Sequence, residues 1–171
     1  MGDIVGVGLI AHAPTIMMPK EQRYELNEGK EISLVPGLHR LREEVLDALK
    51  PDVVIVLDSH WFSTVEFLVS GHGRRSGKYT SEELPRGMRQ VPYDLQGNPA
   101  LAQSIAEHVE AQGVRCFSCD DPFLPIHYPT VNLAHFLNRS EYWLSMSVCQ
   151  TARDHNFLAV GRGLGEAIRK L

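Results

Sequence analysis

Two apolar runs in this chain each lead to a histidine, and this repeated pattern most constrains the fold. The first run covers residues 4–10 and is followed by His12, and the second covers residues 53–57 and is followed by Asp58, Ser59 and His60. Continuous β-branched runs are typical of strands buried on both faces of a parallel sheet. Because parallel strands share one direction, we expect both histidines at the carboxyl edge, where open α/β sheets bind ligands.

Helical and strand patterns alternate along the rest of the chain. Apolar residues at helical spacing predict helices over residues 34–49, 98–113, 130–137 and 157–171. Shorter apolar segments predict strands at 65–69, 114–117 and 142–149. Residues 72–97 are rich in Gly, Pro and Arg without a clear period, which predicts a long functional loop. We therefore predict a single α/β domain over residues 1–171 with a mostly parallel central sheet.

Composition restricts the partners and the compartment. Of the 171 residues, 43% are hydrophobic and 22% charged, with a net charge of −4, which fits an ordinary soluble protein. No basic block is present, so we expect neither a nucleic-acid nor an anionic-membrane partner. No apolar run approaches the roughly 20 residues of a membrane helix. An odd count of three cysteines and the lack of a secretion signal favour the cytoplasm.

The residues around the two runs are candidates for a metal site. His12 and His60, as neutral imidazoles, would supply half of the ligands that a transition metal needs. Asp58 lies on the same side of an extended chain as His60, as a ligand, a partner that orients an imidazole, or a turn residue. Trp61 is interpreted as the wall of an aromatic pocket or as core. His127, in a proline-bounded loop, is either an acid/base group or a loop histidine bonded to backbone.

Three common enzyme patterns are absent from the sequence. No G-x-G-x-x-G follows a strand and no G-x-x-x-x-G-K-[ST] occurs, so nucleotide binding by these routes is unsupported. No G-x-S-x-G marks a serine hydrolase. The histidine pair therefore stays the main functional signal.

Four segments resemble the class III extradiol ring-cleavage dioxygenases, the family of protocatechuate 4,5-dioxygenase catalytic subunits, and most of all its homoprotocatechuate 2,3-dioxygenase members. The matching segments read AHAP at 11–14, PDVVIVLDSHW at 51–61, GKYTSEELP at 77–85 and YDLQGNP at 93–99. They spread over most of the chain, and together they are more specific than any one of them alone.

The resemblance implies a three-layer α/β fold and a mononuclear, non-haem Fe(II) site made of two histidines and one glutamate. Its motif positions place the two histidine ligands at His12 and His60. His127 resembles the family's active-site histidine, with Pro129 where the family has glycine. The implied reaction is extradiol cleavage of a catecholic substrate by O₂, in aromatic compound catabolism. Pairing with a second copy or a related subunit is implied as well.

The chain also departs from the family pattern. In the family, the glutamate ligand and an acid/base histidine follow C-terminal to the region that matches residues 1–171. We therefore expect either the N-terminal part of a ring-opening dioxygenase or a shortened relative. Two alternatives stay open: a non-catalytic metal-binding or scaffold member that partners a complete subunit, and a zinc hydrolase that uses His12, Asp58 and His60.

Overall fold

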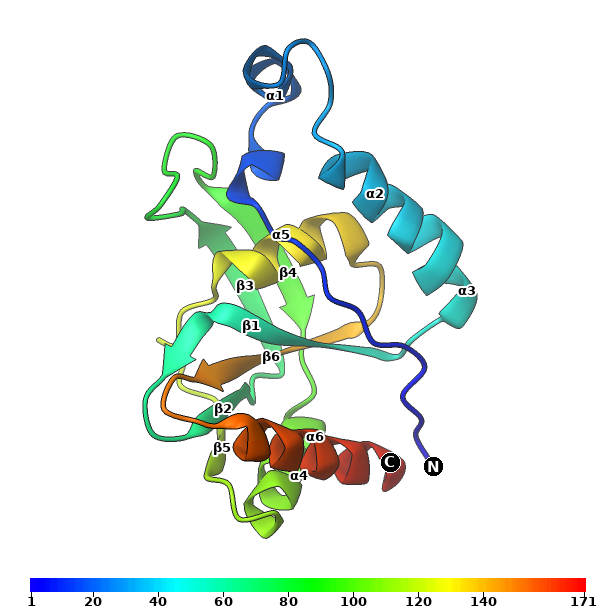
Figure 1. Cartoon of the computed structure of the whole chain (residues 1–171), viewed down its shortest axis with the longest axis vertical. Coiled ribbons are helices and arrows are strands. Elements are labelled where there is room, and N and C mark those ends of the chain that lie inside the picture. The colour runs from blue at the N-terminus through cyan, green and yellow to red at the C-terminus, as the bar shows by residue number, and fades with distance from the viewer.

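The computed structural model describes all 171 residues as an α/β structure (Figure 1). The helical elements are η1 (Pro14–Met17), α1 (Lys20–Leu26), α2 (Leu34–Arg40), the π-helical η2 (Leu41–Leu46), α3 (Asp47–Leu49), α4 (Pro99–Ala111), α5 (Tyr128–Leu137) and α6 (Asp154–Arg169). The strands are β1 (Val53–Ser63), β2 (Phe67–Ser70), β3 (Arg74–Tyr79), β4 (Val91–Gln96), β5 (Cys116–Cys119) and β6 (Tyr142–Cys149).

The central sheet has four strands in the order β1-β6-β2-β5. The pairs β1–β6 and β2–β5 are parallel, and β2 meets β6 in an antiparallel contact at Val69 and Met146. The register between β1 and β6 shifts between Leu57 and Phe62, so β1 carries an irregularity around His60. The prediction of a mostly parallel sheet in an α/β fold is confirmed.

Helices cover both faces of this sheet (Figure 1). On one face, α4 and α6 pack on each other and on β2, β5 and β6, with Leu144 and Met146 completely buried between them. The close approach of the two helices depends on Gly163, because a Cβ there would lie 2.7 Å from the backbone of Val109. On the other face, α2, α5 and η1 pack against β1 and β4 around Trp143. Neighbouring residues of β6 thus point into different cores, as its strand geometry requires.

Local sequence signals explain where the main helices begin and end. Asn98 caps α4 by accepting a hydrogen bond from the Leu101 N–H at 3.0 Å, and Pro99 occupies the first helical position. The helical run from α2 to α3 ends at Lys50, which adopts a left-handed conformation with φ of 49° ahead of Pro51. The predicted helices at 34–49 and 98–113 therefore have clear physical boundaries in the structure.

The strand predicted for residues 4–10 is wrong. Residues 1–13 have no regular secondary structure, and the first backbone–backbone hydrogen bond of the chain joins the Ile16 N–H to the Ala13 carbonyl. Val7 and Leu9 are almost fully exposed, at 94% and 104%. No backbone hydrogen bond joins residues 4–10 to a strand, and a strand is stable only when its N–H and C=O groups find partners. It runs in extended form to the N-terminus, which lies beside the C-terminus (Figure 1).

The long loop predicted for residues 72–97 is wrong in part. Its two ends form the antiparallel hairpin of β3 and β4, and only residues 80–90 between them lack a strand or helix. Glycine, proline and arginine hid a period-2 pattern in which Tyr79, Val91 and Leu95 face the core while Arg74 pairs with Asp94 outside. The hairpin is stabilised by packing on the core, and this packing cannot be recognised from the local sequence.

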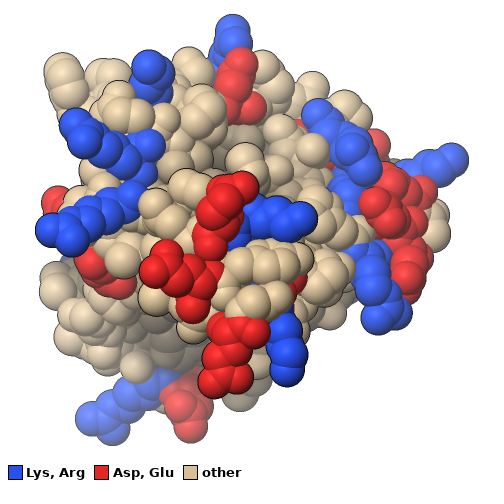
Figure 2. All heavy atoms as spheres, turned by 90° about the horizontal axis from the view of Figure 1, so that it is seen from above, with Lys and Arg blue, Asp and Glu red and all other residues tan.

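The surface carries charges of both signs, and the cysteines form no disulfide. In the face shown in Figure 2, basic and acidic side chains are interspersed rather than gathered into one patch. All three cysteines are free thiols. No helix of the structure combines the length and apolar character needed to cross a membrane.

Candidate metal centre

His60 lies within β1, where the strand is irregular. The β1–β6 register shift between Leu57 and Phe62 surrounds it, and such irregularities re-aim side chains next to functional sites. The Oδ1 atom of Asp58 accepts a hydrogen bond from the His60 backbone N–H at 2.9 Å. This bond fixes the backbone that carries the imidazole. The His60 side chain is 30% exposed.

Asp58 is a buried brace between β1 and the start of α5. It is only 1% exposed. Its Oδ2 atom accepts hydrogen bonds from the Thr130 hydroxyl at 2.6 Å and from the Thr130 N–H at 3.2 Å. Both carboxylate oxygens are therefore engaged. Of the roles predicted for Asp58, the bond to the N–H two residues further on is that of a turn residue, and it does not involve the His60 imidazole.

His12 is held without a strand. Its carbonyl accepts a hydrogen bond from the Asn132 side chain of α5 at 2.9 Å. Four residues later Ile16 is buried, at 1% exposure, in the core beneath η1. The hydrogen bond from Asn132 therefore fixes the chain before Ala13–Pro14, and the burial of Ile16 fixes the chain after it.

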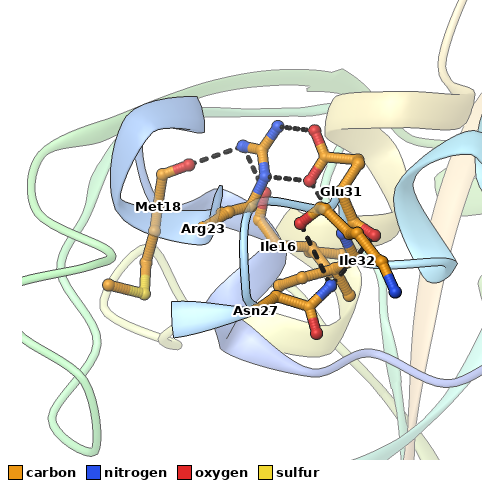
Figure 3. Close-up of polar contacts among 7 residues, drawn as sticks. Ile16, Met18, Arg23, Asn27, Glu31 and Ile32 are labelled. Atoms are coloured by element: carbon orange, nitrogen blue, oxygen red, sulfur yellow. Dashed lines mark hydrogen bonds and ion pairs between the residues drawn. The ribbon is translucent and has the colours of Figure 1, made fainter. Parts of the chain in front are cut away.

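Arg23 of α1 clamps the chain that follows His12 (Figure 3). Its guanidinium donates to the carbonyl oxygens of Met18 at 2.6 Å and Ile16 at 3.3 Å, and it binds both carboxylate oxygens of Glu31 at 2.6 and 2.8 Å. The Asn27 side chain donates to the Glu31 carbonyl at 3.1 Å. The Arg23 guanidinium lowers the pKa of Glu31 to about 2 through the hydrogen bonds that it donates. The clamp ties η1, α1 and the loop before α2 into one unit.

The two imidazoles come together as predicted, although one of them follows no strand. The ring centroids of His12 and His60 are 5.0 Å apart, with an interplanar angle of 79°. A metal about 2.0–2.1 Å from a ring nitrogen lies roughly 3.2 Å from that centroid, so two ligating rings at ordinary coordination angles have centroids about 4.5–5.2 Å apart. The separation of the pair therefore fits a shared metal ion.

Burial favours the neutral form of His12, which is the form that can bind a metal. Burial lowers the pKa of His12, and the neighbouring His60 lowers it further, against the opposite effect of the Asp58 and Glu83 carboxylates. A neutral imidazole has the free lone pair that a metal requires. The pair is nevertheless incomplete, because no group of three or more His, Cys, Asp or Glu side chains converges in the structure to hold a metal.

Tyr128 and Glu83 are the residues at this centre that the sequence analysis missed. The Tyr128 hydroxyl is 2.8 Å from His60 Nε2, and it donates to the Glu83 carboxylate at 3.2 Å. Glu83 also lies 3.4 Å from His60 Nδ1. Burial and the Glu83 carboxylate raise the pKa of Tyr128 to about 12. The clue was available, since Tyr128 is adjacent to His127 and Glu83 lies within the GKYTSEELP motif.

His127 and Trp61 form a separate stacked pair. Their ring centroids are 6.0 Å apart with an interplanar angle of 14°, and Trp61 is 5% exposed. His127 precedes α5 and its carbonyl accepts the Val131 N–H. Burial lowers the pKa of His127, while Asp58 raises it and Arg75 and His60 lower it. Trp61 thus packs as a buried residue against His127, and the ring that faces the histidine pair is that of Tyr128, 4.4 Å from His60 and 5.6 Å from His12.

One cavity of the structure lies away from the histidine pair. It has a volume of about 740 Å³ and lies among α1, α2, α5 and β4, with Arg23, Val35 and His135 in its walls. Neither His12 nor His60 lines it. The converging side chains of the histidine pair, and not this cavity, mark the candidate site.

Comparison with known proteins identifies the family. Residues 6–171 match the family described as the catalytic LigB subunit of aromatic ring-opening dioxygenase, so the chain belongs to this family. The resemblance to class III extradiol dioxygenases is thereby confirmed.

One curated relative gives a more particular comparison. The chain is 29% identical over 170 residues to 3,4-dihydroxyphenylacetate 2,3-dioxygenase of Escherichia coli. The alignment covers 99% of this chain and 60% of the relative. The chain thus spans about three fifths of the length of that enzyme.

Proposed function

We propose that this chain carries the two histidine ligands of an aromatic ring-opening dioxygenase that cleaves catecholic substrates with O₂ next to their hydroxyl pair. The observation that carries the proposal is the convergence of His12 and His60, with ring centroids 5.0 Å apart, in a chain of the LigB family. A non-haem Fe(II) ion is the metal that fits this activity, since two histidines and a carboxylate leave open positions for a chelating substrate and O₂.

His12 and His60 would hold the Fe(II) ion, which supplies the redox chemistry that joins the aromatic ring and O₂. The chain's own contribution is orientation. Asp58 fixes the backbone of His60, while Asn132 and the Arg23 clamp fix the segment of His12. Trp61 packs against His127, which is the acid/base candidate for a substrate hydroxyl proton.

The structure contains no third ligand in a metal-binding arrangement with the pair. We propose that a carboxylate from a further polypeptide segment or from a partner subunit completes the site, which makes an oligomer with a related subunit the expected functional form. The proposed substrate class, a catechol with an acidic side chain, follows the name of the Escherichia coli relative.

The test is anaerobic loading with Fe(II), followed by 3,4-dihydroxyphenylacetate, protocatechuate and air. We expect one iron per chain and a yellow ring-fission product, whose formation is measured by its absorbance. His12→Ala and His60→Ala should each remove iron binding, while the exposed His155→Ala should not. A wild-type chain that binds no iron would contradict the proposal.

A second candidate is favoured by the absence of a three-ligand group. The chain would then be a non-catalytic, metal-binding or scaffold member that partners a complete subunit. Iron bound with no product from any catechol would favour this function. So would retained partner binding by the His12→Ala and His60→Ala variants.

A further inference from the structure

The cavity among α1, α2, α5 and β4 has the size of a ligand pocket. Its volume of about 740 Å³ falls within the roughly 300–1,000 Å³ of pockets that bind small molecules. Part of its wall is apolar, because the buried residues Ile16, Val35 and Val91 and the half-buried Phe136 line it. The cavity therefore offers an apolar surface that a ligand can cover.

The charged side chains of this cavity are mostly basic, although the chain has a net charge of −4. Its wall contains one acidic residue, Glu43, and five basic ones, Lys20, Arg23, Arg42, Arg89 and Arg139. Three of the five are paired with carboxylates that do not line the cavity: Arg23 with Glu31, Arg42 with Asp47 and Glu141, and Arg139 with Asp47. The charges of these three arginines are therefore balanced by the protein itself.

The other two basic residues, Lys20 and Arg89, have no anionic partner. None of the ion pairs of the structure involves Lys20, Arg89 or Glu43. The Lys20 ammonium lies 5.2 Å from the centroid of the Tyr24 ring, and the side chains of Lys20 and Arg89 are exposed. Two cations and one carboxylate leave the wall with one net positive charge, which a ligand with one negative charge would balance.

Two imidazoles lie beside the aromatic part of the wall. His39 of α2 and His135 of α5 contact the Phe136 ring edge to face, with centroids 5.5 and 5.0 Å away. Burial and the neighbouring His39 lower the pKa of His135, which favours its neutral form. A neutral imidazole still donates one ring N–H to an acceptor. The wall thus places hydrogen-bond donors next to its apolar surface.

We propose that this cavity binds a small organic carboxylate with an apolar body, with Arg89 and Lys20 on the carboxylate and Ile16, Val35 and Phe136 around the body. The planar guanidinium of Arg89 can donate two parallel hydrogen bonds to a carboxylate. A carboxylate carries the single negative charge that the wall lacks, whereas a phosphate dianion would leave an excess of negative charge. The site is separate from the candidate metal centre, because neither His12 nor His60 lines it.

NMR titration of the metal-free chain with hexanoate tests this binding. We expect saturable shifts of the backbone amide signals of Val91, His135 and Phe136, with the signal of His60 unchanged. Hexanamide has the same body without the charge and should bind about tenfold more weakly, which is the size of one charge-assisted hydrogen bond. Acetate keeps the charge without the body and should also bind at least about tenfold more weakly.

Variants of the two free cations assign the carboxylate contact. Arg89→Gln should lower hexanoate affinity about tenfold and Lys20→Gln about threefold, because the guanidinium donates two bonds and the ammonium is a single point charge. The matched controls are Arg86→Gln and Lys30→Gln, which remove exposed cations that do not line the cavity. Both should keep hexanoate affinity within about twofold of wild type, because solvent and salt screen distant charges. Thermal melting of each variant checks that it folds.

Four results would overturn the inference. They are the lack of saturable shifts at the cavity, equal affinities for hexanoate and hexanamide, tighter binding of hexyl phosphate than of hexanoate, and equal losses in Arg86→Gln and Arg89→Gln. Tighter binding of hexyl phosphate would assign the cavity to phosphates. Because the titration uses the metal-free chain, a failure of the wild type to bind Fe(II) contradicts the proposed function and leaves this inference unaffected.

Discussion

The two apolar runs that lead to His12 and His60 have similar sequences but different structures. Residues 53–57 became part of β1, paired in parallel with β6, and Val56 is 9% exposed. Residues 4–10 are extended but unpaired, and Val7 is 94% exposed. The difference is the presence of a neighbouring strand. A run of β-branched residues favours an extended backbone, but it forms a strand only when it hydrogen-bonds to another strand.

The comparison also shows two ways to place a histidine. His60 is positioned by its own strand and by Asp58, whereas His12 is positioned by side chains from elsewhere, Asn132 and Arg23. Pairing with a strand is therefore not required to bring the two imidazoles together. The clamp in Figure 3 holds the segment that follows His12, whereas the sheet holds the strand that contains His60.

The largest contrast is expected in hydrogen exchange. The amides of β1 that donate to β6 should exchange at least about a thousandfold slower than intrinsic rates, whereas the alternate amides of this edge strand point away from β6. Amides of residues 4–10 make no backbone hydrogen bonds and should exchange at near-intrinsic rates. Exchange measured by NMR or mass spectrometry checks both. Protection of residues 4–10 would show that a partner, such as a second copy, pairs with this segment.

The second prediction concerns the anchor of β6, the strand that supports β1. Glu141, just before β6, accepts a hydrogen bond from Arg42 of η2, and both residues are buried, at 7% and 5% exposure. Arg42→Met leaves a buried carboxylate without its cation and should lower the free energy of unfolding by about 3–5 kcal/mol.

Urea denaturation at neutral pH measures this effect. The control is Arg40→Met, which removes the exposed partner of Glu44 and should change stability by less than about 0.5 kcal/mol. Equal effects of the two variants would refute the view that the Arg42–Glu141 pair anchors β6.

The third prediction compares the same substitution in the two runs. Val56→Ala removes buried methyl groups and opens a small cavity, which should cost about 2 kcal/mol. Val7→Ala removes exposed methyl groups and should stay within about 0.5 kcal/mol of wild type. Chemical denaturation of both variants provides the measurement. A comparable loss for Val7→Ala would mean that the first run is buried in solution.

The smallest expected effect is the pH dependence of the clamp behind His12. Because Arg23 lowers the pKa of Glu31 to about 2 from its ordinary value of 4.5, the carboxylate stabilises the fold above pH 4.5. That stabilisation is lost as the pH falls from 4.5 towards 2. The melting temperature of Glu31→Gln should therefore lie below that of wild type at pH 6 and converge with it near pH 2. The control is Glu25→Gln, which changes an exposed carboxylate of α1 and should leave the melting temperature at pH 6 equal to that of wild type.

Much of the fold followed from local patterns with clear physical causes. The helices at 34–49 and 98–113 were marked by apolar spacing and by Asn98, Pro99 and Pro51. The hairpin of β3 and β4 was missed because its alternation is interrupted by glycine and arginine, and its inward residues are recognisable only against the core that they cover.

The closeness of the two histidines could be predicted from the sequence, but the residues around them could not. His12 and His60 were identified from the paired runs and from the family resemblance, and the structure brings them together. Tyr128 was missed in favour of its neighbour His127. Which of two adjacent side chains faces a site depends on how α5 begins, and that is fixed by Thr130 and Asp58, 72 residues apart in sequence.

The sequence by itself determined the α/β class, the family and the pair of histidines, because periodicity, capping residues and short motifs are encoded locally. The tertiary structure decided which apolar run became a strand, that Asp58 braces the backbone, and that Tyr128 and Glu83 complete the surroundings of the pair. These outcomes depend on contacts between segments far apart in the chain. Such contacts form only when the whole core has packed.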